Sequence, residues 1–70
     1  MKRDEFLHKY HYYQTKNMDK AVAEAEEINA LGIEDDVAVA VMFPSLGYCL
    51  MLASAAEHLK ELEIPVEVMK

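Results

Sequence analysis

The sequence predicts a single α/β domain over residues 1–70, built on a three-stranded, mostly parallel sheet with two helices on one face. Two observations lead to this prediction. A chain of 70 residues is long enough for only one core, and segments with helical spacing of apolar residues alternate with short segments of strand character. The order reads strand, helix, strand, helix, strand. With the most apolar strand in the middle, right-handed crossovers would place both helices on the same face and leave the other face open.

The first half of the chain predicts a strand and a helix. Residues 6–14 are rich in aromatic side chains and lack helix formers after Leu7, which favours a strand. Residues 18–31 carry apolar side chains at helical spacing, and this pattern predicts a helix. Asn17 is placed to cap its N-terminus and Gly32 to end it.

The second half predicts a strand, a long helix and a short strand. Residues 37–43 form a continuous apolar run, typical of a central strand covered on both faces. Pro44 ends this strand, and Ser45 is placed to cap a helix over residues 46–62. Residues 66–69 alternate in the manner of a short third strand.

Apolar surface in excess of one small core predicts a homodimer. The first half of the predicted helix 46–62 is apolar on nearly all sides, and such a helix is normally buried on all sides. The open sheet face would be a second uncovered apolar surface. Cys49 is the only cysteine, so no internal disulfide stabilises the domain, and a partner subunit is expected to do so. The residues expected at the dimer interface are Leu46, Leu50 and Ala53.

The net charge of -6 arises from one segment of the chain. Between residues 19 and 36 there are seven acids and one base, Lys20, and the remaining six acids balance six bases. Such a segment disfavours direct binding of nucleic acid and favours a basic protein partner with fast, salt-sensitive association. A solvated helix face that only keeps the protein in solution is the alternative. The acids expected to bind the partner are Asp19, Glu24, Glu26, Glu27, Glu34, Asp35 and Asp36.

Composition and the N-terminal residues predict a cytoplasmic protein. No apolar run approaches the ~20 residues that span a bilayer, so no membrane association is expected. Residues 1–5 contain a basic pair without the apolar core of a signal peptide. A single unpaired cysteine suits a reducing compartment.

Two other functions stay open at this point. The predicted strand-to-helix turn around Ser45 and Gly47 could hold an anionic metabolite on helix N–H groups, which would make the protein a small ligand-binding or regulatory subunit. One glycine is far short of a phosphate-binding loop, however. Cys49, expected in the first turn of the helix, could act as a thiol nucleophile. No evident base supports catalysis, and a small buried apolar side chain is the simpler interpretation.

The histidines and tyrosines do not predict a binding site. His8 and His11 would point to opposite faces of a strand, and His58 lies alone on a helix, so the about four ligands of a structural metal site are missing. The three tyrosines of residues 10–13 could stack on bases, but the acidic chain favours packing within the fold. We expect neither a metal nor a cofactor.

Together these observations predict a non-enzymatic interaction or inhibitor protein that occupies a basic surface of a partner, such as a nucleic-acid-binding protein. In size and charge the chain resembles small acidic accessory or phage-type proteins that block a basic host surface, some of them as DNA mimics. A two-fold dimer would present two acidic segments to such a surface. No family motif carries this resemblance.

Overall fold

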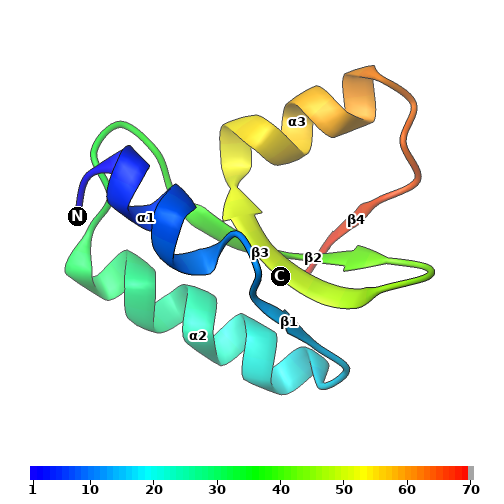
Figure 1. Ribbon diagram of the computed structural model, residues 1–70, viewed down its shortest axis with the longest axis horizontal. Coiled ribbons are helices and arrows are strands. Elements are labelled where there is room, and N and C mark those ends of the chain that lie inside the picture. Colours follow the sequence, from blue (N-terminus) through cyan, green and yellow to red (C-terminus); the bar gives the residue numbers. More distant parts are fainter. Residues whose placement is uncertain (70) are drawn as a thin grey trace.

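The computed structural model describes residues 1–69, which form three helices and a four-stranded antiparallel sheet (Figure 1). In chain order the elements are α1 (Arg3–Tyr10), β1 (Gln14–Thr15), α2 (Met18–Leu31), β2 (Ala38–Phe43), β3 (Gly47–Leu52), α3 (Ala53–Glu61) and β4 (Glu67–Met69). The predicted three-stranded, mostly parallel sheet is wrong, because every neighbouring pair of strands runs antiparallel.

The strand order β1-β3-β2-β4 interlocks two β-α-β units. In the unit β1-α2-β2 the two strands are parallel to each other and enclose β3, and in the unit β3-α3-β4 they enclose β2. Both crossovers step across the sheet in the same direction while their strands point in opposite directions. Crossovers of one hand then place α2 and α3 on opposite faces, as Figure 1 shows. The prediction that both helices share one face is therefore wrong.

Helix α1 replaces the strand that was predicted over residues 6–14. Phe6 is buried, and the ring of Tyr10, one helical turn later, lies 5.2 Å from it between centroids. This i, i+4 pair packs only if the segment is helical, and burial of Phe6 outweighs the strand preference of the aromatic residues. A strand does follow, but it contains only Gln14 and Thr15.

Helix α2 confirms the prediction for residues 18–31, including both ends. The Asn17 side chain accepts a hydrogen bond from the backbone N–H of Lys20 at 3.1 Å, which satisfies one of the free donors of the first turn. Gly32 has a positive φ of 84° and donates its N–H to the carbonyls of Ile28 and Asn29, which ends the helix.

The long helix predicted over residues 46–62 is wrong in its first half, which forms strand β3. This strand pairs with β2 as a hairpin, with Phe43 opposite Gly47 and Ala38 opposite Leu52. The predicted helix is confirmed only for its second half, as α3. Both faces of β3 are covered, so its side chains are apolar on both sides and do not alternate with polar ones. The sequence pattern of such a strand is the same as that of a buried helix.

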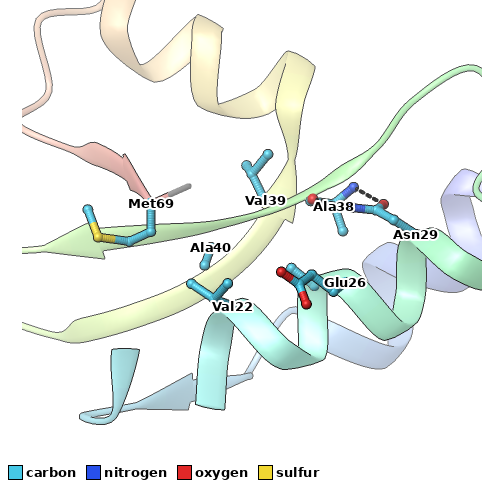
Figure 2. Close-up of a pocket in the computed structure, with 8 residues that line it drawn as sticks. Val22, Glu26, Asn29, Ala38, Val39, Ala40 and Met69 are labelled. Carbon is cyan, nitrogen blue, oxygen red and sulfur yellow. Dashed lines mark hydrogen bonds between the residues drawn. The ribbon is translucent and has the colours of Figure 1, made fainter. Parts of the chain in front are cut away.

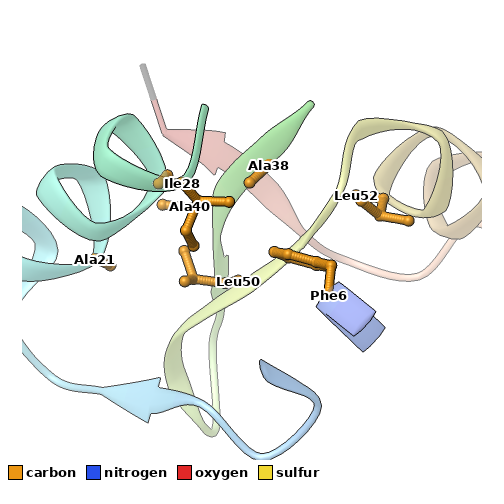
Figure 3. Packing of buried hydrophobic residues seen from close by; sticks show 8 residues of the cluster. Phe6, Ala21, Ile28, Ala38, Ala40, Leu50 and Leu52 are labelled. Atoms are coloured by element: carbon orange, nitrogen blue, oxygen red, sulfur yellow. The ribbon is translucent and has the colours of Figure 1, made fainter. Parts of the chain in front are cut away.

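Apolar side chains fill the space on both faces of the sheet. On one face, α1 and α2 cover alternate residues of β2 and β3, and Figure 3 shows Phe6 and Ile28 turned toward Leu50 and Ala40. On the opposite face, α3 contacts β2 and β3. Val41 alternates with Ala40 along β2, so its side chain points to that face, and it is fully buried. The prediction of an open sheet face is therefore wrong. The buried cluster on the α1 and α2 side comprises Phe6, Ala21, Ala25, Ile28, Ala38, Ala40, Leu50 and Leu52.

Strand β4 confirms the prediction for residues 66–69, but it is an antiparallel edge strand beside β2. Its described pairing reaches Ala40, two residues short of Ala38. The Asn29 side chain of α2 takes over at this point. It donates to the carbonyl of Ala38 at 2.8 Å and accepts from the N–H of Ala38 at 2.7 Å. The amide of Asn29 thus pairs with Ala38 as a peptide group of a neighbouring strand would.

Candidate partner-binding surface

Helix α2 divides the predicted acidic residues between its inner and outer sides. Ala21, Ala25 and Ile28 face the sheet and are buried, so positions on the opposite side of the helix face solvent. Asp19, Glu26 and Glu27 are exposed. Within residues 1–69 none of these three carboxylates takes part in an ion pair. They are therefore free to meet a partner.

Glu24 lies on a different side of α2 and contacts α1. It is half-buried and accepts a hydrogen bond from the hydroxyl of Tyr10 at 3.4 Å. Burial, the negative charge of Glu24 and the electrostatic effect of the nearby Tyr10 raise the pKa of the neighbouring Tyr13. Within the described part of the chain the Tyr13 hydroxyl has no hydrogen-bond partner. Glu24 thus stabilises the contact between two helices.

The three acids at positions 34–36 also divide. Glu34 and Asp35 are exposed in the turn before β2. The side chain of Asp36 is only 7% exposed and lies 3.7 Å from the Arg3 guanidinium. It accepts hydrogen bonds from the Ser54 hydroxyl at 2.5 Å and from the Val37 N–H at 2.9 Å. These contacts connect the starts of α1, β2 and α3.

The same contacts lower the pKa of Asp36. The hydrogen bond from Ser54 is the largest cause, since it stabilises the charged form of the carboxyl group; the N–H of Val37 and the charge of Arg3 add to it, and burial acts against them. Of the seven acids predicted to bind a partner, the structure therefore leaves five exposed, namely Asp19, Glu26, Glu27, Glu34 and Asp35.

A groove runs beside Glu26, between α2 and the strands β2 and β4 (Figure 2). It has a volume of about 160 Å³, and most of its lining is apolar. We call it the α2–β4 groove; the residues that line it are Val22, Ala25, Glu26, Asn29, Ala38, Val39, Ala40 and Met69. Sequence reasoning missed it. The spacing of Val22, Glu26 and Asn29 places them on one side of a helix, but nothing in the sequence shows which strand lies beside them.

The residues predicted at a dimer interface do not form one surface. Leu50 is buried in the core on the α2 side, Ala53 is half-buried at the start of α3, and Leu46 is 48% exposed in the hairpin turn. The apolar excess that led to the dimer prediction is largely buried within one chain. The homodimer stays a prediction, to be tested by the mass in solution.

Cys49 does not lie at a helix N-terminus as predicted. It lies inside β3, opposite Val41 on one side and Gln14 on the other. Burial raises the pKa of its thiol, which lowers the fraction of reactive thiolate at neutral pH.

The turn that was considered for an anionic metabolite connects two strands. Residues 44–46 form the hairpin turn between β2 and β3, so the strand-to-helix turn predicted around Ser45 and Gly47 is wrong. Gly47 is required there for a structural reason. Its φ is +94°, and a Cβ atom would lie 2.8 Å from the backbone oxygen of Thr15 in β1.

The helical form of α1 changes the position of two histidines. His8 and His11 were expected on opposite faces of a strand, but their rings lie 6.2 Å apart between centroids, and His11 Nδ1 is 2.9 Å from the carbonyl oxygen of His8. Among residues 1–69 no group of three or more His, Cys, Asp or Glu side chains is arranged to hold a metal ion. The pair thus lacks a third ligand.

No helix among the described residues has both the length and the apolar character needed to cross a membrane. Comparison with family models, with curated proteins and with solved structures gave no match. Function is therefore inferred from the geometry of the acidic surface and of the groove beside it.

Proposed function

We propose that this protein is a non-enzymatic, acidic interaction protein that occupies a basic surface of a partner protein, in the manner of a nucleic-acid mimic. The observation that carries the proposal is the exposed side of α2, where Asp19, Glu26 and Glu27 have no ion-pair partner within residues 1–69. Lys20 is the only base of this helix. A surface of one sign attracts a partner of the opposite sign over a distance.

The spacing of these charges supports a mimic with a lower charge density than DNA. The three exposed acids over the 14 residues of α2 give one negative charge per about 7 Å of helix axis, since each residue rises ~1.5 Å. Duplex DNA carries one charge per about 1.7 Å and holds condensed counterions. Binding by α2 should therefore weaken with salt, but less steeply than the 10³- to 10⁵-fold loss between 50 and 200 mM salt of a protein that contacts many phosphates.

The alternative of a metabolite-binding subunit depended on a helix N-terminus beside residues 45–47, and a strand follows that turn instead. The alternative of a thiol-dependent enzyme depended on a lowered pKa of Cys49, and burial raises it. Both alternatives therefore lose the feature on which they were based.

The test compares two variants of equal charge in a lysate capture experiment. In the first, Asp19→Asn, Glu26→Gln and Glu27→Gln remove three charges from α2. In the second, Glu5→Gln, Glu57→Gln and Glu61→Gln remove three charges from exposed positions of α1 and α3. Each variant and the unmodified protein are immobilised, and the retained proteins are identified at 50 and 500 mM salt.

The proposal expects basic proteins that bind the unmodified protein and the second variant, are lost with the first variant, and are released by salt. Equal retention by both variants would show that the α2 surface has no special role. Retention that resists 500 mM salt would contradict the electrostatic basis of the proposal.

A further inference from the structure

The α2–β4 groove exists because small side chains meet where a helix crosses a strand. Ala25 of α2 packs in one cluster with Ala38 and Ala40 of β2. The described residues of β4 pair with β2 from Met42 to Ala40, and the groove lies beside Met69 (Figure 2). Protein interiors are normally packed without voids. The described residues 1–69 therefore leave a space of about 160 Å³ with apolar walls that an outside group could enter.

Glu26 supplies the charge that an occupant of the groove would meet. Asn29 is the other polar side chain of the lining, and both the nitrogen and the oxygen of its amide are hydrogen-bonded to the backbone of Ala38. Glu26 is exposed, and within residues 1–69 it has no ion pair. Its side chain lies at the margin of the groove, beside the labelled Ala40 and Val22 in Figure 2. Among residues 1–69 no base lines the groove.

Further carboxylates lie along the same side. Asp19 precedes Glu26 by two helical turns, which places it on the same side of α2, about 10 Å along the axis. Glu67 alternates with Met69 along β4, so its side chain is on the sheet face that α2 covers. A groove with apolar walls and acidic margins suits a group that is apolar along its length and positive at its end.

We propose that the α2–β4 groove receives the side chain of a lysine or arginine from the basic partner. Its methylene stem lies on Val22, Ala40 and Met69, and its charged end donates hydrogen bonds to the carboxylate of Glu26. Long basic side chains commonly bury their stems along apolar surface and keep the charged end at the margin. This inference rests on the proposed function and names the contact through which the partner is recognised.

The experiment titrates the full chain with three capped hexapeptides and follows backbone amide shifts by NMR. Hexalysine is the probe. A hexamer of diaminopropionic acid has the same backbone and number of basic groups but a stem of one methylene, and hexa(acetyl-lysine) keeps the stem without the charge. The variants are Glu26→Gln and, as the matched control, Glu57→Gln, which removes the same charge from an exposed position of α3, outside the proposed surface.

The proposal expects hexalysine to shift the amides of the groove and to bind tighter than the short-stemmed hexamer. Glu26→Gln should weaken hexalysine binding by about fivefold, the effect of losing one ion pair, and Glu57→Gln by less than ~2-fold. Equal binding of the two charged hexamers would refute the proposal that the groove receives a basic side chain, as would equal effects of the two variants. In either case salt-sensitive binding would leave the proposed function standing, whereas no binding of either hexamer would count against both.

Discussion

The substitution Asn29→Ala tests the two hydrogen bonds that hold strand β2 at Ala38, next to the described part of its pairing with β4. Two hydrogen bonds connect the Asn29 amide to the N–H and C=O of Ala38, at 2.7 and 2.8 Å. Ala38 is 3% exposed. Alanine at position 29 would remove both bonds and leave two backbone groups without a partner in a mostly apolar groove.

The expected cost follows from these two groups. A buried donor or acceptor without a partner costs about 1–3 kcal/mol, so two of them cost about 2–6 kcal/mol. Alanine regains ~0.6 kcal/mol through its better helix propensity. Because water can enter the groove and hydrate the freed groups in part, we expect a loss of about 1.5–3 kcal/mol. That is a large share of the about 3.5–10 kcal/mol expected for a domain of 70 residues.

Urea unfolding followed by circular dichroism measures this loss. The matched control is Ala30→Asn, at the next residue of the same helix, where the side chain is exposed and only the difference in propensity, about 0.6 kcal/mol, is expected. If Asn29→Ala costs no more than this control, the role assigned to the amide is refuted.

Asn29→Asp adds a pH signature to the same test. The introduced carboxylate can accept from the N–H of Ala38, but it faces the carbonyl oxygen of Ala38 without a proton to donate. The fold therefore favours the protonated form and raises the pKa of the introduced group. A carboxyl group whose pKa is raised by folding destabilises the fold when it is ionised. The loss in free energy of unfolding relative to the unmodified protein should therefore shrink as the pH falls. A deficit that stays constant between pH 7 and pH 4 would contradict the assigned hydrogen-bond pattern.

Three other substitutions test the described contacts by the same unfolding assay. Phe6→Ala should cost about 3–5 kcal/mol because it empties the core contact of α1, whereas Leu7→Ala, at a residue 48% exposed, should cost less than ~1 kcal/mol; similar costs would contradict the helical α1. Gly47→Ala should cost clearly more than Gly32→Ala: both residues have positive φ, which costs ~1 kcal/mol in each, but only at position 47 would the new methyl group meet backbone, at 2.8 Å. Asp36→Asn should destabilise the protein at neutral pH. Since the fold lowers the pKa of Asp36, its contribution is present above the ordinary value of 3.8 and is lost as the pH falls below it. The gap between Asp36→Asn and the unmodified protein should therefore close in acid, and a gap that widens there would refute the assignment.

Local sequence signals were sufficient to predict the elements whose structure depends mainly on their own residues. Helix α2 has an apolar stripe, an N-cap at Asn17 and a C-terminal glycine at position 32, and it forms with these ends. The apolar run of β2 and the short alternation of β4 were also sufficient.

The structures of β3 and α1 depend on contacts with segments distant in the sequence, and these two elements were predicted wrongly. Residues 47–52 are covered by α1 and α2 on one face and by α3 on the other, so their apolar side chains give no strand periodicity. A turn of residues 44–46 that ends at a glycine is a hairpin signal, and it was the available indication of β3. In α1, the choice of helix depends on the pocket that Phe6 fills in the folded protein.

The candidate surface was predictable in its charge and not in its arrangement. Counting acids locates the segment from residue 19 to residue 36. It does not reveal that Asp36 is held by Ser54 and Arg3, or that Glu24 contacts Tyr10. It also does not reveal that Glu26 lies beside a groove, because the opposite wall comes from Met69, 43 positions later in the chain.

The interlocked strand order has a consequence for how the chain acquires its structure. If the backbone were cut in the turn of residues 44–46, each fragment would hold a β-α-β unit whose middle strand belongs to the other fragment. Neither half could complete its own hydrogen-bond ladder, so neither should be ordered alone, yet a mixture of the two could assemble into the whole. Partial unfolding would then be disfavoured, and the chain should lose its structure in one cooperative step.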